Sequence, residues 1–156
     1  MSEIVLREAV PEDLSLVREL FLEYARSLNF DLSFQHFDEE LSTLPGKYSR
    51  PRGCILLAYS GGQPAGCIAL RPFDATRCEM KRLFVRPAFR GLHLGDALIA
   101  RFLHEARQGG YRSVLLDTVQ PLMSTAIAMY KRLGFREIPP YCRNPVAGAL
   151  FLELEL

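Results

Sequence analysis

Apolar and polar positions along the chain recur with two different periods, which separates candidate strands from candidate helices. A two-residue period or a short apolar run predicts a strand, whereas apolar positions three and four residues apart predict a helix. The predicted strands cover residues 4–8, 54–59, 65–70, 79–85, 113–118 and the end of the chain. The predicted helices cover residues 11–28, the surroundings of 37–44, 94–106 and 121–134.

The most informative stretch is residues 77–110, where a strand pattern, a loop with spaced glycines and an amphipathic helix follow one another. Proline has no backbone N–H to donate, so Pro87 ends the predicted strand. Its two predicted faces are Glu79, Lys81, Leu83 and Val85 on one side and Met80, Arg82 and Phe84 on the other. The apolar stripe of the helix consists of Leu94, Leu98, Ile99, Phe102, Leu103 and Ala106.

Gly95 falls in the first turn of this helix. The first N–H groups of a helix have no internal partner and lie at the positive end of its dipole, so they suit a phosphate or pyrophosphate. A P-loop is excluded because no Gly-Lys-Ser/Thr follows. The dinucleotide fingerprint GxGxxG is absent, since three residues separate Gly91 from Gly95. The sequence therefore predicts a phosphate-binding loop of a third kind.

Residues 90–95, RGLHLG, resemble Q/R-x-x-G-x-G/A, the pyrophosphate loop of the GNAT superfamily of N-acetyltransferases, and the preceding EMKRLFVRP is similar to that family's central strand. A second stretch is similar to the family's A-x-x-x-Y-x-x-x-G-F through Ala126, Tyr130, Leu133, Gly134 and Phe135. The two motifs stand in the right order with one strand between them, which makes the match more specific than either motif alone.

The resemblance implies that acetyl-CoA is the cosubstrate, with its pyrophosphate on the loop and its pantetheine arm along the motif strand. His93 replaces the usual middle glycine but still offers its N–H, and Met123 replaces an asparagine that contacts pantetheine in some relatives. Arg86 and Arg90 are further candidates for pairing with phosphates. The expected cofactor-binding residues are Leu83, Phe84, Val85, Arg90, Gly91, Leu92, His93, Leu94, Gly95 and Asp96.

Acetyl transfer to an amine needs a base, because deprotonating an alkylammonium of pKa about 10.4 at neutral pH costs roughly 4.6 kcal/mol. Glu79 is the candidate, acting through an ordered water or with a raised pKa; the alternative is a surface carboxylate paired with Lys81 or Arg82. The resemblance implies that Tyr130 protonates or hydrogen-bonds the departing thiolate. The alternative for Tyr130 is a tyrosine buried for packing.

Composition adds limits to this interpretation. The chain has 156 residues, of which 49% are hydrophobic, so we expect one domain over residues 1–156. Lys plus Arg number 19 and Asp plus Glu 18, so no global field would attract nucleic acid or an anionic membrane. Four cysteines without a CxxC motif argue against a metal site or a redox pair. Because the sequence has no signal peptide and no apolar run of about 18 residues, we predict a cytoplasmic protein.

The resemblance also implies an α/β fold with a mixed, mostly antiparallel sheet of about seven strands flanked by about four helices. The acceptor is expected to be a primary amine of a small molecule or peptide, bound by the loops 29–48 and 139–148. Candidate lining residues are Tyr141, Arg143 and Asn144, and Arg143 or Arg71 would suit an acceptor with a carboxylate or phosphate. Family habit further suggests a homodimer in which the apolar final strand, as a sheet edge, pairs with its copy.

A second class of function stays open at this point. The chain could be a non-catalytic acyl-CoA-binding module that senses the cofactor or regulates a partner. A dinucleotide-binding oxidoreductase is disfavoured by the missing GxGxxG. The presence of Tyr130 favours the enzyme.

Overall fold

The computed structural model describes residues 3–120 and 122–156. One sheet runs in the order β1-β2-β3-β4-β5-β7-β6, and only β4 and β5 are parallel neighbours. The strands are β1 (Ile4–Glu8), β2 (Cys54–Ser60), β3 (Gln63–Pro72), β4 (Arg77–Val85), β5 (Ser113–Val119), β6 (Arg136–Ile138) and β7 (Ala149–Glu155). The helices are α1 (Leu14–Ser27), α2 (Phe37–Ser42), α3 (Leu94–Gln108) and α4 (Ser124–Arg132). The predicted mixed sheet, its element order and its flanking helices are confirmed.

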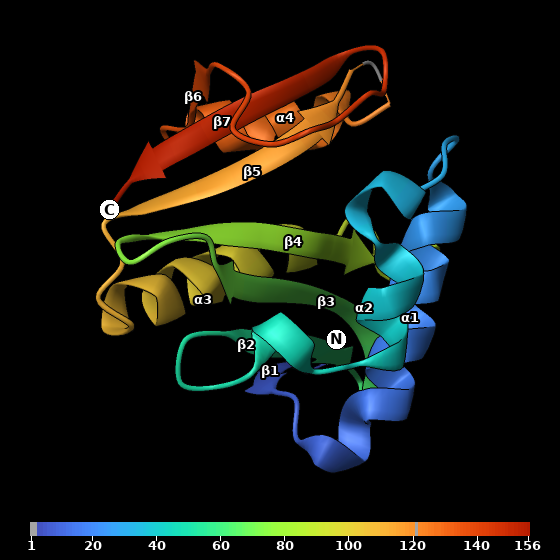
Figure 1. Cartoon of the computed structure of the whole chain (residues 1–156). Helices are drawn as coiled ribbons and strands as arrows, with labels where there is room; N and C mark the ends of the chain where they lie inside the picture. Colours follow the sequence, from blue (N-terminus) through green and yellow to red (C-terminus); the bar gives the residue numbers. More distant parts are fainter. Residues whose placement is uncertain (1–2, 121) are drawn as a thin grey trace.

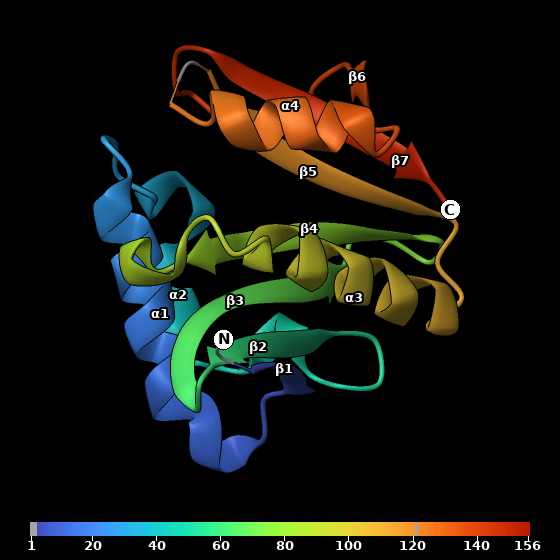
Figure 2. The same ribbon diagram turned by 180° about the vertical axis from the view of Figure 1, so that it is seen from behind.

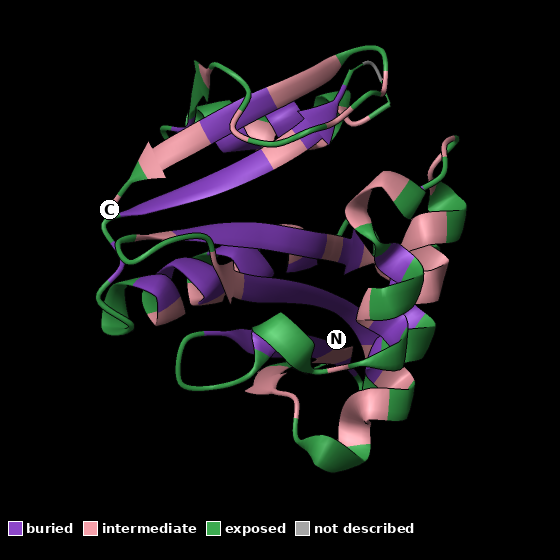
Figure 3. Ribbon diagram, in the orientation of Figure 1, coloured by how far each residue is buried: buried purple, intermediate pink, exposed green. Residues whose placement is uncertain are grey.

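Helices cover the sheet on both faces. α1 and α2 lie on one face of the sheet, and α3 and α4 lie on the other (Figures 1 and 2). Two buried clusters correspond to these layers: Leu98 and Phe102 of α3 belong to one, and Val17 and Phe21 of α1 belong to the other. The central strands between the layers are buried (Figure 3). The apolar stripe predicted for α3 is buried along its whole length.

A β-bulge interrupts β4 at Arg82, whose φ is 62°. Cys67 pairs with Phe84 and Ala69 pairs with Lys81, so one residue of β3 faces two residues of β4. The extra residue reverses the alternation of faces, and Leu83 and Val85 pack against the cluster under α3.

Glu79, before the bulge, faces the other layer, where it borders a cavity together with residues of α2. The prediction that Glu79 shares a face with Leu83 and Val85 is therefore wrong. An inserted residue moves every later position of the strand to the opposite face. A two-residue period in the sequence does not show where such an insertion occurs.

The Arg82 side chain ties the bulge to the α1–α2 layer and is only 1% exposed. Its guanidinium donates to both carboxylate oxygens of Glu40, each at 2.9 Å, and to Gln35 Oε1 at 2.9 Å. The rings of Tyr24 and Phe37 lie 5.6 and 5.1 Å from the guanidinium carbon. This arrangement anchors α2 and the turn η2 (Ser33–Gln35) over β4.

The central parallel pair of strands separates soon after it forms. β4 and β5 pair over three residues, ending at Glu79 and Leu115. Beyond that point the two strands diverge toward the side on which α1 and α2 lie (Figure 1). The edge of β4 after Glu79 is consequently not joined to β5.

The last strand does not lie at an edge of the sheet. β7 pairs with β5 along its length and with β6 over three residues. The expectation that the final strand offers a sheet edge for dimerisation is therefore wrong. The short β6, which follows α4, pairs with β7 and covers that edge. Its three residues are too few to give a clear strand pattern in the sequence.

Replacing Arg82 should show how much the bulge depends on its anchor. We expect Arg82→Met to lower the free energy of unfolding by about 3–5 kcal/mol, because it leaves the Glu40 carboxylate without its partner. Urea unfolding measures this loss. The exposed Arg112, changed to Met, is the matched control and should change stability little. A loss below 1 kcal/mol at Arg82 would contradict the anchoring role.

Candidate active site

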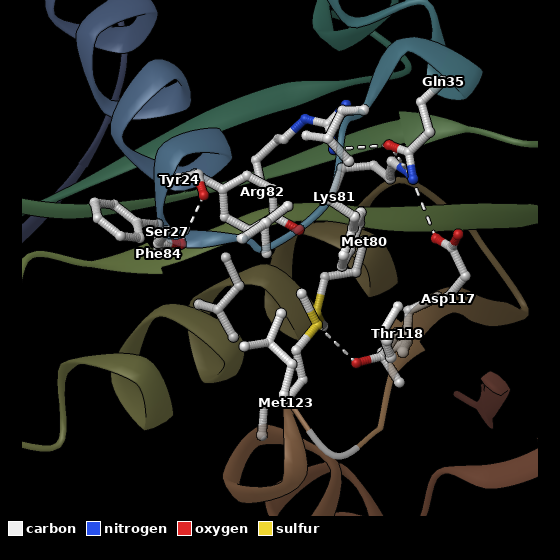
Figure 4. Close-up of a pocket in the computed structure, with 18 of the residues that line it drawn as sticks. Tyr24, Ser27, Gln35, Met80, Lys81, Arg82, Phe84, Asp117, Thr118 and Met123 are labelled. Carbon is white, nitrogen blue, oxygen red and sulfur yellow. Dashed lines mark hydrogen bonds and ion pairs between the residues drawn. The ribbon is translucent and has the colours of Figure 1, made fainter. Parts of the chain in front are cut away.

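A cavity of about 350 Å³ occupies the space where β4 and β5 separate. We call it the cofactor cleft. Its walls come mainly from α1 with the segment after it, the bulged end of β4, the end of β5, and α4 (Figure 4). The residues most relevant to the predicted site are Leu83, Phe84, Val85, Arg90, Met123 and Tyr130.

A shallower hollow lies at the start of α3 and shares Val85 and Arg90 with the cofactor cleft. Gly91, with φ of 85°, and Gly95 line it. A Cβ added at either glycine would meet nothing within 4 Å, so the space in front of the first helical turn is open. Because the first N–H groups of α3 have no internal partner, this hollow can accommodate a pyrophosphate.

His93 is the residue that precedes α3 and adopts φ of 60°. This left-handed conformation is the one that glycine adopts without strain, and it explains why a glycine is usual at this position. The imidazole is 86% exposed, and its Nδ1 lies 3.4 Å from Asp96 Oδ2. Leu92 and Asp96 are exposed, whereas Leu94 is buried under the helix.

The two arginines predicted to meet phosphates differ. Arg86 donates to both carboxylate oxygens of Glu23, at 3.0 and 2.8 Å, and is occupied there. Arg90 is exposed and donates only to the Val85 carbonyl, at 3.1 Å, among the described residues. Arg90 is thus the better placed of the two for a phosphate.

Tyr130 lies on α4, and Gly134, two residues after the end of this helix, has the predicted left-handed conformation, with φ of 104°. Its ring is buried against Phe135, with centroids 5.6 Å apart, and borders the cofactor cleft. The hydroxyl makes no hydrogen bond within the described residues, and burial raises its pKa. The side chain therefore packs and also keeps a free proton donor at the cleft.

Met123 also borders the cleft, and its sulfur accepts a hydrogen bond from Thr118 Oγ1 at 3.0 Å. A thioether cannot replace the asparagine contact found in some relatives. Pro121, the predicted start of this helix, lies outside the described residues.

A second cavity of about 350 Å³ lies between the α2 layer and the loop that joins β6 to β7. We call it the acceptor pocket. Arg71, Glu79, Lys81, Cys142 and Arg143 border it. Both loops that the sequence assigned to the acceptor contribute to its walls.

Glu79 is 3% exposed, so it is not the surface carboxylate of the alternative interpretation. Its Oε1 accepts from Arg71 Nε at 2.8 Å, and its Oε2 accepts from the Tyr141 hydroxyl at 2.7 Å. Lys81 lies farther away, at 3.8 Å. Among the predicted acceptor residues, Tyr141 thus contacts Glu79, and Arg143 is exposed at the pocket.

Three of the described residues border both cavities: Gln35, Lys81 and Asp117. Lys81 Nζ lies 3.1 Å from Gln35 Oε1 and 3.4 Å from Asp117 Oδ1 (Figure 4). Asn144 donates to the other Asp117 oxygen at 3.0 Å. This junction was not predicted from the sequence. A charged Asp117 inside the otherwise uncharged strand SVLLDT was the available signal.

The comparisons with known proteins agree with this geometry. Residues 15–135 match the acetyltransferase (GNAT) family. An uncharacterised N-acetyltransferase of Schizosaccharomyces pombe is 39% identical over 149 residues, which cover 94% of this chain and 91% of that protein. The chain therefore belongs to the GNAT family of acetyltransferases, and the resemblance seen in its motifs is confirmed.

Solved structures share the fold. An acetyltransferase from Streptococcus agalactiae superposes with a TM-score of 0.77 at 22% identity, covering 99% of this chain and 98% of that one. The PaiA N-acetyltransferase of Thermoplasma acidophilum, solved in complex with coenzyme A, gives a TM-score of 0.74 at 16% identity, with 99% of each chain covered. Within the described residues, no helix is both long and apolar enough to cross a membrane.

The conformation of His93 gives a stability prediction. We expect His93→Gly to raise the free energy of unfolding by about 1 kcal/mol, because glycine adopts the left-handed conformation without strain. His93→Ala removes the same imidazole but keeps Cβ, so it should give no such gain. Chemical denaturation of the three proteins compares them. An equal effect of Gly and Ala would show that the strain is absent.

Proposed function

We propose that this chain acts as one domain that transfers an acetyl group from acetyl-CoA to a primary amine. The observation that carries the proposal is the continuity of three cavities through shared lining residues. Val85 and Arg90 join the hollow at α3 to the cofactor cleft, and Lys81 and Asp117 join that cleft to the acceptor pocket. A phosphate site, a channel and an acceptor site in that order fit a two-substrate transferase.

The loop before α3 is proposed to hold the pyrophosphate by its N–H groups, with Arg90 as the charged partner. The edge of β4 beyond Glu79 offers backbone groups to the amide-rich pantetheine arm, at Leu83 to Val85. When bound, acetyl-CoA supplies an activated acyl group whose thiol is the leaving group. The coenzyme A in the PaiA structure supports the same ligand class here.

Tyr130 is proposed to donate a proton, or a hydrogen bond, to the departing sulfur. Its free hydroxyl borders the cleft, and burial raises its pKa, so the phenol keeps its proton beyond its usual range. A protonated phenol is the form that this role requires. A raised pKa also makes complete proton transfer less favourable, so stabilisation of the sulfur by hydrogen bonding is the larger part of the role.

Glu79 is proposed to act on the amine proton at one remove, through a water or another carboxylate. Both of its oxygens hold hydrogen bonds, from Arg71 and Tyr141, and it borders the acceptor pocket without bordering the cofactor cleft. Glu79 is therefore not positioned for direct contact with an amine that attacks in the cofactor cleft.

The transfer is proposed to be direct, without an acyl-enzyme. Cys142 is the exposed cysteine, but partial burial of its sulfur raises the pKa of the thiol to about 11. The nucleophilic thiolate is therefore scarce at neutral pH. Cys142 also borders the acceptor pocket rather than the cofactor cleft. A ternary complex of both substrates avoids any need for it.

The acceptor is proposed to be a small molecule or the end of a peptide, because the pocket holds about 350 Å³. Lys47 and Arg143 are exposed at this pocket without an ion pair among the described residues. They would favour an acceptor that carries an acidic group away from its amine.

Filling the proposed phosphate site should weaken cofactor binding. We expect Gly95→Trp to lower the affinity for acetyl-CoA at least about 10-fold, because the indole would occupy the open space in front of α3. Isothermal titration calorimetry measures the affinity. Ala100→Trp, on an exposed position of the same helix, is the matched control and should bind as the original chain does. Equal binding by all three proteins would place the cofactor elsewhere.

Removing the Tyr130 hydroxyl tests the proposed role of Tyr130 as the acid for the departing sulfur. We expect Tyr130→Phe to lower kcat about 10²-fold while acetyl-CoA binding is kept, because the ring still packs. Thiol release measured with a panel of primary amines gives kcat. Tyr111→Phe, which loses a hydroxyl bonded to the Arg52 carbonyl, is the control. Since burial raises the pKa of Tyr130, its ionisation should not reduce kcat between pH 8 and pH 10. Full activity of Tyr130→Phe would remove the hydroxyl from the mechanism.

A further inference from the structure

Asp117 is the one carboxylate, among the described residues, that borders both the cofactor cleft and the acceptor pocket. It lies on β5 beyond Leu115, where the strand has separated from β4. Its side chain is 4% exposed. An amine that attacks a thioester in the cleft from the acceptor pocket must pass this position.

The hydrogen bonds of Asp117 leave room for such an amine. Its Oδ2 accepts one bond from Asn144, at 3.0 Å, and its Oδ1 has a long contact with Lys81, at 3.4 Å. An ionised carboxylate offers about four lone-pair sites, so two remain for further donors. Lys81 balances the buried negative charge while no acceptor is present.

Glu79 is less suitable for the direct contact. Two Arg71 nitrogens lie 2.8 Å from Oε1, and the Tyr141 hydroxyl lies 2.7 Å from Oε2. A carboxylate oxygen of Glu79 lies within 4.8 Å of one of Asp117. One bridging water can span that distance, which connects the two carboxylates.

We propose that Asp117 binds the ammonium group of the acceptor at this junction and takes the proton that must leave before attack. The inference rests on the proposed acetyl transfer and names the residue that touches the reacting nitrogen. Glu79 then receives the proton through water or passes it to solvent. Gln35, which accepts from Lys81 and Arg82, positions the lysine beside Asp117.

The proton balance follows from this assignment. The acceptor enters as an ammonium with three protons on nitrogen and leaves as an amide with one. The N–C bond forms while the C–S bond breaks. One of the two lost protons leaves through Asp117 to solvent. In the overall balance, the other compensates for the proton that Tyr130 gives to the sulfur. No further reactant is required.

Asp117→Asn tests the proposal, because asparagine keeps the size of aspartate and one acceptor oxygen but removes the charge and the second acceptor. We expect Asp117→Asn to lower kcat/KM for methylamine, a cation at pH 7, about 10²–10³-fold, as for loss of a general base. Hydroxylamine is of similar size but uncharged at pH 7, so its acetylation should fall much less. Asp117→Glu should recover part of the methylamine activity. A structural defect would affect both amines alike.

Acetyl-CoA titration of each variant serves as the folding control and should be unchanged. The matched variant Glu79→Gln should lose less activity toward methylamine than Asp117→Asn. Equal losses for methylamine and hydroxylamine, or no loss, would overturn the role of Asp117 while leaving acetyl transfer intact. Absence of thiol release by the original chain with any amine, including a panel of amino acids and dipeptides, would overturn the proposed function itself and this inference with it.

Discussion

The geometry of this protein depends on how β4 is bent away from β5. One extra residue at Arg82 bulges the strand, and pairing between the two parallel strands ends at Glu79 and Leu115. A sheet that stayed fully paired would have no room for a ligand between these strands. The bulge persists because Arg82 is bonded to Glu40 and covered by two aromatic rings. The cleft thus lies beside a backbone irregularity that a buried ion pair holds in place.

The same anchor brings the acceptor side of the site into place. By binding Glu40 and Gln35, Arg82 holds the α2 layer over β4, and this layer forms one wall of the acceptor pocket. Lys81, the neighbouring residue, lies at the junction of the two cavities. The strand therefore contributes structural and chemical residues at adjacent positions, so a change at Arg82 would alter both fold and site.

Charges at the junction are paired, which is how a buried cluster of this kind is tolerated. Arg71 is bonded to Glu79, and Lys81 lies beside Asp117. An unpaired buried charge would cost several kcal/mol, whereas each carboxylate here lies beside a cation that orients it. Lys47 and Arg143, which have no ion pair among the described residues, lie instead at the exposed rim of the acceptor pocket. The paired charges are thus buried, and these two cations face water.

Local periodicity and the spacing of residues within one stretch of chain were enough to predict most of the elements, the family and a candidate phosphate loop. The stripe of α3, the first-turn Gly95 and the capped end of α4 at Gly134 are of this kind. Only the tertiary structure shows the bulge at Arg82, the covering of β7 by β6 and the junction at Asp117. Each depends on partners distant in sequence: Glu40 for the bulge, and Lys81 and Asn144 for Asp117. Periodicity carries no information about such partners, so these contacts became apparent only when strands and loops were packed together.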